Sequence, residues 1–404
     1  MPRMTSRIAL VALLALSACG GSENTGNSSG SGSNPYAGKT LKLGAVLSMT
    51  GAGAVYGVGT KNGADLAVDT INASGGVNGA MVSLTTRDDA SDKAQSAQVA
   101  QTLIQQDQVL GLLGPTLSNS AVAMHPLAES LHVPVVGISN TGINIVPDCN
   151  FPDQTPCKFI FRDSLGEETA IPDNIKAYSD AAHPKTAVLL VAKDDKFSSD
   201  GGVIVQQNVA KFGITLLASI QFSKADADLS TPVTSAVQKN PDVIFITSLG
   251  NIPARIMTAA RTQGFKGQFL GGNGFNTAVV SKAAGAAGKG AQSGSAWYIN
   301  NTFPSNAAFV SAYKAKYNID PDQFAAQGYT GVLIMAAAAK AAGLTFGDPT
   351  QDRQKLRDAL EKVSLDTPLG PFQFTSTHDV KQTVWIIQMD GSGGFTLVTS
   401  IKPS

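Results

Sequence analysis

The 404-residue chain has no excess of charge of either sign, since 30 Lys and Arg side chains are matched by 30 Asp and Glu side chains. It also contains no long basic run. Nucleic acids and acidic surfaces are bound through clustered positive charge, so the composition argues against either as a partner. Long apolar runs are equally scarce. The Ala-rich stretch over 332–342, for example, is short and carries Lys340. No segment beyond the N-terminus therefore has the pattern of a membrane-spanning helix.

Sequence motifs for catalysis, cofactors and metals are missing as well. The turn over 51–53 begins like a dinucleotide fingerprint but has Tyr56 where the third Gly is required. The chain has no Gly-Lys-Ser/Thr phosphate loop, no Gly-x-Ser-x-Gly elbow, and four His at no metal-ligand spacing. Asp88 and Asp89 look like a catalytic carboxylate pair, but we expect them to cap the following helix. The sequence predicts a binding protein without cofactor or metal, with a secreted hydrolase as the alternative that any ligand turnover would favour.

Cysteine is rare, and the first of the three Cys residues lies near the N-terminus. Cys19 follows a short basic segment, an apolar run over 8–16 and the small residues of Leu16-Ser17-Ala18. The run is too short to span a bilayer, and the arrangement is typical of a signal peptide over 1–18. Its end resembles a bacterial lipobox, which implies a lipid on Cys19; an ordinary signal peptide with an incidental Cys is the alternative.

The segment that follows Cys19 is rich in Gly, Ser and Asn and has almost no apolar side chain. Such a composition cannot bury enough surface to fold, so residues 19–38 are predicted to form a flexible tether. We therefore expect an exported protein on the periplasmic or extracellular face, attached to the cell membrane only through its N-terminal lipid.

The two remaining cysteines, Cys149 and Cys157, flank a loop with Pro and Asp residues. Export permits a disulfide, so a local cross-link is the predicted role. A metal site is the competing interpretation, and the lack of a His nearby counts against it.

After the tether, apolar runs typical of buried strands alternate with segments of helical periodicity. The expected strands are 41–47, 82–86, 109–113 and 133–138, followed by 186–191, 214–220, 243–246 and 268–270. Strands alternating with helices at this spacing indicate βαβ units and a parallel sheet. Because the pattern restarts near 186, we predict an α/β protein of two doubly wound lobes, which the helices and short strands after 307 complete.

Two loops with polar side chains follow strands of the first lobe. Residues 114–120 contain Ser118, and Ser139 and Thr141 follow the next strand. Ligands of open parallel sheets bind beyond the carboxyl ends of the strands, where helix N-termini favour an anion such as a carboxylate. Helix capping is the alternative role for either loop alone, but two such loops on adjacent strands favour a binding site.

Aromatic residues are expected at the same edge. Tyr56 lies in the first Gly-rich turn, and Phe197 lies in a loop of the second lobe. Facing one another across a cleft, they would enclose an apolar or planar group, whereas packed loop residues are the alternative.

Four segments together resemble the leucine/isoleucine/valine-type periplasmic binding proteins of ABC transporters, which have the type I fold. They are LKLGAVLSMTGAGAVYGVGTKNGADLAVDTINASGGVNG, RDDASD, GLLGPTLSNS and HVPVVGIS. The resemblance extends from about Leu41 to the C-terminus, and it implies closure around a small ligand and delivery to a permease. A ligand-sensing lobe of a signalling system is the alternative with the same fold.

The resemblance also implies three hinge crossovers, near 161–162, 294–297 and 370–371. Lobe 1 would then comprise 39–161 plus 296–369, and lobe 2 would comprise 162–295 plus 370–404. The ligand-binding residues that it implies are Tyr56, Ser118, Ser139, Thr141, Phe197, Asn273 and Phe324.

Among these, Ser118 matches the residue that binds the ligand carboxylate in the family. Two positions depart from the family pattern: Leu249 replaces an aromatic residue, and Asn273 replaces the acid that pairs with the α-amino group. An amide can still accept an N–H but lacks the charge-assisted component. Glu167 and Glu168 are the candidates for a replacement charge, and the ligand is either an amino acid or another small carboxylate or amide compound.

Overall fold

The computed structural model describes residues 34, 36–146, 148–149 and 156–403. The predicted signal peptide, Cys19 and most of the predicted tether lie outside these residues. Within the described part of the chain, no helix is both long enough and apolar enough to cross a membrane.

The first lobe is built on an all-parallel sheet of five strands in the order β2-β1-β3-β4-β5. Its strands are β1 (Thr40–Leu47), β2 (Met81–Asp88), β3 (Gly111–Leu113), β4 (Val135–Gly137) and β5 (Ile160–Arg162). Its helices are α1 (Ala54–Ala73), α2 (Lys93–Gln105), α3 (Ser118–Ser130), α9 (Asn306–Tyr317), α10 (Gln323–Ala341) and α11 (Pro349–Leu360).

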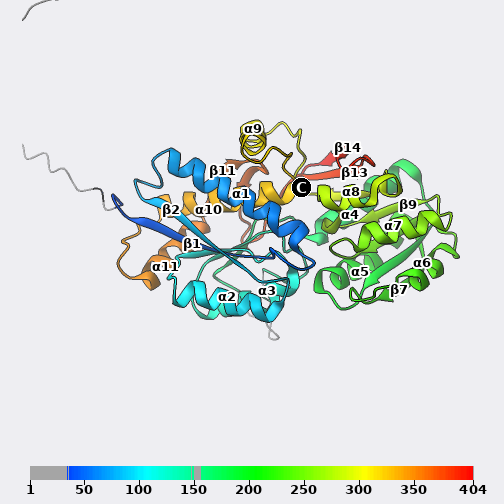
Figure 1. Cartoon of the computed structure of the whole chain (residues 1–404), viewed down its shortest axis with the longest axis horizontal. Coiled ribbons are helices and arrows are strands. Elements are labelled where there is room, and N and C mark those ends of the chain that lie inside the picture. Colours follow the sequence, from blue (N-terminus) through cyan, green and yellow to red (C-terminus); the bar gives the residue numbers. More distant parts are fainter. Residues whose placement is uncertain (1–33, 35, 147, 150–155, 404) are drawn as a thin grey trace, which may run out of the picture. The chain divides into compact units, whose positions relative to one another are not determined.

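Both faces of this sheet are covered. Leu41 and Leu43 of β1 pack in a core with α1, α10 and α11, whereas Val46 packs in a second core with α2 and α3. Figure 1 shows α1 and α10 on one side of β1, and α2 and α3 on the other. Strand residues that alternate between two apolar cores are the signature of a doubly wound sheet.

The second lobe has seven strands in the order β14-β13-β10-β9-β8-β6-β7. They are β6 (Thr186–Ala192), β7 (Thr215–Phe222), β8 (Val243–Thr247), β9 (Gln268–Gly271), β10 (Gln292–Ser295), β13 (Val384–Met389) and β14 (Phe395–Ile401). Strands β6 to β10 pair in parallel. At one edge, β13 pairs antiparallel with β10, and β14 pairs antiparallel with β13, so the sheet is mixed where a parallel one was expected.

Helices cover both faces of the second sheet too. They are α4 (Glu167–Ala182), α5 (Lys196–Asn208), α6 (Ser230–Val237), α7 (Ile252–Thr262) and α8 (Ala278–Gly288), with short 3₁₀ turns η1 (Val209–Phe212) and η2 (Asn273–Phe275). Cores with α6 to α8 on one face and with α4 and α5 on the other enclose the sheet. The predicted α/β fold of two doubly wound lobes is thus confirmed.

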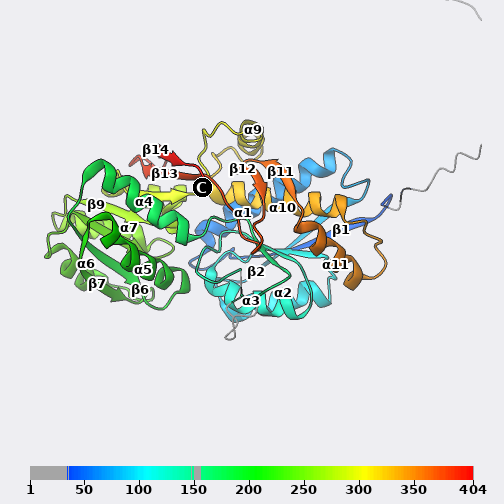
Figure 2. The same ribbon diagram turned by 180° about the vertical axis from the view of Figure 1, so that it is seen from behind.

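The chain crosses between the lobes after β5, after β10 and before β13. The third crossover differs from the prediction at 370–371. A hairpin of β11 (Ser364–Thr367) and β12 (Gly370–Gln373) buries Phe372 in the first-lobe core, and Phe374 pairs with Val380 before β13 begins. Figure 2 shows this hairpin beside α10 and β13 beside α4. The crossover therefore lies between 380 and 384, and the predicted lobe boundaries remain a proposal with this shift.

The predicted cross-link between the last two cysteines is present in the structure. A disulfide joins Cys149 to Cys157, whose Cα atoms are 6.0 Å apart. The Glu129 carboxylate lies next to it but accepts the backbone N–H groups of Lys158 and Phe159 at 2.9 and 2.8 Å. Two sulfurs bonded to each other are not free thiolates, so this cluster is a local cross-link and not a metal site.

Candidate functional site

The loop between β3 and α3 exposes a helix N-terminus at the carboxyl edge of the first sheet. Gly114 has a φ of +101°, and a Cβ there would lie 2.2 Å from the Val46 carbonyl oxygen, so the sharp turn requires glycine. The N-cap of α3 is Leu117, whose side chain caps nothing. Ser118 is consequently the first residue of the helix and not its cap. The first-turn N–H groups of α3 are thus available to an anion.

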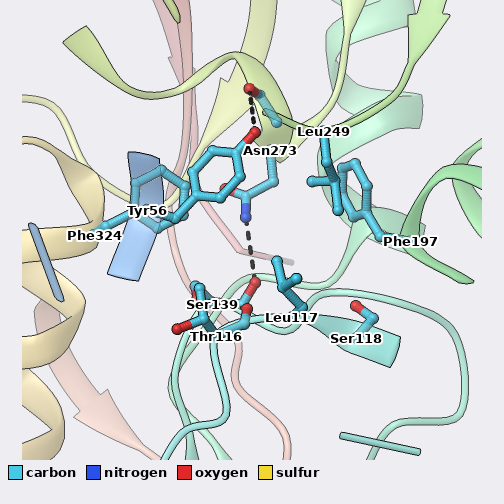
Figure 3. A pocket seen from close by; sticks show the side chains of 10 residues that line it. Tyr56, Thr116, Leu117, Ser118, Ser139, Phe197, Leu249, Asn273 and Phe324 are labelled. Carbon is cyan, nitrogen blue, oxygen red and sulfur yellow. Dashed lines mark hydrogen bonds between the residues drawn. The ribbon is translucent and has the colours of Figure 1, made fainter. Parts of the chain in front are cut away.

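A small cavity lies between the two lobes at this point (Figure 3). Its lining residues are Tyr56, Thr116, Leu117, Ser118, Ser139, Phe197, Leu249, Asn273, Gly274 and Phe324. The space left between them is only about 10 Å³, which is room for a single water molecule. The structure thus brings together all the sequence-predicted binding residues except Thr141, together with Leu249, the position that departs from the family pattern. Thr116, Leu117 and Gly274 complete the lining.

Thr141 lies behind the cavity. Its carbonyl accepts the Glu167 N–H at 3.0 Å, and its hydroxyl oxygen is 3.4 Å from Glu167 Oε1. The same Oε1 atom accepts the backbone N–H of Asn273 at 2.7 Å. Glu167 is fully buried, and burial raises the pKa of its carboxyl to about 7.

The position of Glu167 at the start of α4, directly after the first crossover, explains this contact. The crossover brings the helix N-terminus between the loops that follow β4 and β9. Its second oxygen, Oε2, faces the backbone at Gly272, where a Cβ would lie 2.4 Å away. Sequence reasoning named Glu167 as a candidate charge but had no signal that could place it.

Tyr56 spans the two lobes from the N-terminal turn of α1. Its hydroxyl donates to the Gly274 carbonyl at 3.1 Å and accepts the Gly250 N–H at 2.9 Å, while its ring packs 4.9 Å from the ring of Phe324. Burial raises the pKa of this hydroxyl, so it stays neutral and can donate. Figure 3 shows the ring as one wall of the cavity.

A second set of bonds joins the lobes through Asn119, a residue that sequence reasoning left unassigned. Its Oδ1 accepts the Lys196 N–H at 2.9 Å, and its Nδ2 donates to Asp195 Oδ1 at 3.2 Å. Asp195 also caps α5 by accepting the Ser198 N–H at 2.9 Å. The first turn of α3 therefore binds the N-terminus of α5 directly, so the lobes are in contact around the cavity.

The expected capping role of Asp88 and Asp89 is wrong. The cap of α2 is Asp92, whose carboxylate accepts the Gln95 N–H. Asp89 is buried and accepts the hydroxyls of Ser48 and Ser120 at 2.7 and 2.9 Å. This carboxylate ties together the loops that follow β1 and β3, and so supports the site from behind.

Comparison with known proteins defines the class. The family model described as periplasmic binding protein matches residues 40–394, and the chain belongs to this family. Together with the fold, this makes it a type I periplasmic binding protein of the kind associated with ABC transporters, as the sequence resemblance implied.

Individual relatives are similar over most of their length. The leucine-, isoleucine-, valine-, threonine- and alanine-binding protein of Pseudomonas aeruginosa is 25% identical over 358 residues, which cover 87% of this chain and 90% of the relative. The branched-chain amino acid binding protein LivJ of Streptococcus pneumoniae, solved with isoleucine, is 25% identical with a TM-score of 0.80, covering 90% of this chain and 100% of LivJ. A solute-binding protein of R. palustris, solved with benzoate, has a TM-score of 0.80 at 22% identity, covering 90% and 97%.

Proposed function

We propose that this protein captures a small carboxylate with an apolar body between its two lobes and delivers it to the permease of an ABC transporter. The observation that carries the proposal is the composition of the cavity wall. It combines the uncapped N-terminus of α3 and the hydroxyl of Ser118 with the apolar side chains of Phe197, Leu249 and Phe324. N–H groups and a hydroxyl suit a carboxylate, while the aromatic and aliphatic side chains suit an apolar group.

The relatives support this class of ligand without fixing its identity. Those named above bind leucine, isoleucine, valine, threonine and alanine, or were solved with isoleucine or benzoate. All of these compounds carry a carboxylate, and all except threonine have a purely apolar body beside it. None of the residues that line the cavity here is charged. Recognition of the anion therefore falls to hydrogen-bond donors and the dipole of α3.

Binding requires the lobes to part and close again. A space of about 10 Å³ does not admit any of these ligands. Opening would break the bonds that Tyr56 and Asn119 make across the cleft, and closing around the ligand would restore them.

The test is a thermal-shift and calorimetric screen of the full-length protein, purified in detergent, against amino acids, aromatic acids and their amides. We expect carboxylates to bind and their matched amides, such as benzamide against benzoate, to bind at least tenfold more weakly. Equal binding of acids and amides, or no binding by any acid, would count against the proposal. Loss of uptake in cells lacking the protein tests delivery, whereas intact uptake with a lost response to the ligand favours the sensory alternative.

The anchor is part of the same proposal. An exported binding protein that serves a membrane permease benefits from attachment through Cys19, the residue at the predicted lipobox. Incorporation of labelled fatty acid should occur in the native protein and disappear in the Cys19→Ser variant. Labelling that persists in that variant would exclude Cys19 as the lipid site.

A further inference from the structure

We propose that Gln323, which does not border the cavity, fixes the side-chain amide of Asn273 so that its NH₂ group faces the ligand. The ligand then carries a hydrogen-bond acceptor at this point and not an ammonium group. This inference rests on the proposed function and narrows its ligand to acids such as 2-oxo acids.

The orientation of Gln323 is set by the backbone N–H of Ala296, a donor that cannot accept. Its Oε1 accepts the backbone N–H of Ala296 at 2.8 Å and the hydroxyl of Ser295 at 2.6 Å. A backbone N–H can only donate, so the atom facing Ala296 must be the oxygen. The third donor to Oε1 is Asn276 Nδ2 at 3.2 Å, and the same Nδ2 donates to the carbonyl of Gly294 at 2.8 Å. The contact with a carbonyl fixes the amide of Asn276 independently.

This orientation is passed on to Asn273. With Oε1 committed, Nε2 of Gln323 points to Asn273 and donates to its Oδ1. Nδ2 of Asn273 therefore lies on the opposite side, 3.4 Å from the Ser139 carbonyl oxygen, at the wall of the cavity (Figure 3). The reverse orientation would place two NH₂ groups against each other and Oδ1 against the carbonyl of Ser139. Both side chains are buried, so water cannot relieve those contacts.

The nearest buried carboxylate does not supply the missing negative charge. Glu167 is absent from the cavity wall, its Oε1 accepts the Asn273 N–H, and its Oε2 faces Gly272. An ammonium group in the cavity would meet the NH₂ of Asn273 and no anion. A carbonyl or other acceptor oxygen would meet a donor.

The chemistry that fits is an apolar monocarboxylate with an acceptor beside the carboxylate. Ser118 and Ser139 line the same small cavity, and Nδ2 of Asn273 lies 3.4 Å from the Ser139 carbonyl oxygen, so the group that reaches Asn273 is close to the ligand carboxylate. Branched or aromatic 2-oxo acids combine these features.

The test uses calorimetry on the full-length protein with two pairs of probes that differ only in this group. The pairs are leucine against 4-methyl-2-oxopentanoate, and phenylalanine against phenylpyruvate. We expect the oxo acid of at least one pair to bind about tenfold more tightly than its amino acid, or better, because a buried donor left facing a donor is costly.

Two substitutions test the mechanism. Gln323→Glu offers Asn273 an acceptor in place of the Nε2 donor, so the amide should reverse and the preference for the oxo acid should fall at least tenfold at pH 8. Asn273→Asp places an acceptor at the cavity wall directly and should lower the preference in the same direction. Gln101→Glu is the matched control, the same exchange on the exposed side of α2, where the Gln101 amide donates to Gln105, and its ratio should stay within twofold of the native value.

The outcomes separate the two proposals. Tighter binding of the amino acid in both pairs, or an unchanged ratio in both Gln323→Glu and Asn273→Asp, overturns the role of Gln323 while carboxylate capture stands. A native protein that binds no acid in the screen overturns the proposed function itself.

Discussion

Removing the hydroxyl of Tyr56 should weaken closure of the lobes without unfolding either of them. In Tyr56→Phe the Gly250 N–H and the Gly274 carbonyl lose a partner that the structure places at 2.9 and 3.1 Å. With the lobes apart both groups are hydrated, but closure now buries them without a partner. Each hydrogen bond has a net value of about 0.5–1.5 kcal/mol, so the closed form loses about 1–3 kcal/mol.

This loss converts directly into ligand affinity. If the free protein is mainly open, a closed form that is about 1–3 kcal/mol less stable raises the Kd about 5- to 150-fold. The ring still packs on Phe324, so the free energy of unfolding should change little. Titration calorimetry gives the Kd, thermal unfolding gives the stability, and small-angle scattering reports whether ligand still closes the lobes.

Tyr317→Phe is the matched control for this experiment. The Tyr317 hydroxyl donates to the Asn62 carbonyl at 2.8 Å, a bond between α9 and α1 within the first lobe. Its loss should lower the unfolding temperature and leave the Kd unchanged. A native Kd in Tyr56→Phe, or an equal increase in both variants, would refute the assignment of Tyr56 to closure.

Three further predictions concern the anion site, the buried acid and the cross-link. Ser118→Ala should weaken carboxylate binding about tenfold at unchanged stability, whereas Ser130→Ala at the other end of α3 should not; equal affinities by calorimetry would remove Ser118 from the site. The raised pKa of Glu167, about 7 against an ordinary 4.5, means that the folded protein holds a proton that the unfolded chain releases. The stability that this carboxyl contributes is complete below pH 4.5 and is lost as the pH rises to about 7. The unfolding temperature of Glu167→Gln should therefore rise relative to that of the native protein over this range. A difference that stays constant with pH would contradict the raised pKa. Replacing Cys149 and Cys157 together by Ser should cost about 2–3 kcal/mol, as expected for a loop of 8 residues, and should make unfolding insensitive to reductant; a native protein that is equally insensitive would contradict it.

Periodicity was sufficient to predict the lobes because each central strand is apolar on both faces. Val188 and Leu190 of β6 face one core while Leu189 and Val191 face the other, which makes an uninterrupted apolar run. The direction of a strand is a different matter. Residues 384–389 form one of the short strands predicted after 307, but only their pairing with β10 makes that strand antiparallel, and the residues themselves carry no sign of its direction.

The residues of the cavity wall could be predicted from the sequence, but the residues behind the wall could not. Loops after parallel strands meet at one edge, which places Ser118 and Ser139 together on general grounds. The contacts of the residues behind the wall could not be predicted, because their partners are remote in sequence. Asn119 contacts Asp195 at a separation of 76 residues, and Glu167 contacts Asn273 at a separation of 106. A Ser, Asn or Glu near the start of a helix gives the same sequence pattern whether its side chain caps that helix or binds another lobe.

The size of the cavity has a kinetic consequence. A space of about 10 Å³ walled by Tyr56, Leu249 and Phe324 offers no route by which a solute diffuses in while the lobes are together. The ligand therefore enters while the lobes stand apart and the lobes then close over it, so the observed rate of complex formation should rise with ligand concentration and level off at the rate of the lobe motion. In a medium rich in ligand, the supply of loaded protein to a permease would be timed by this molecule's own motion and not by the abundance of its cargo.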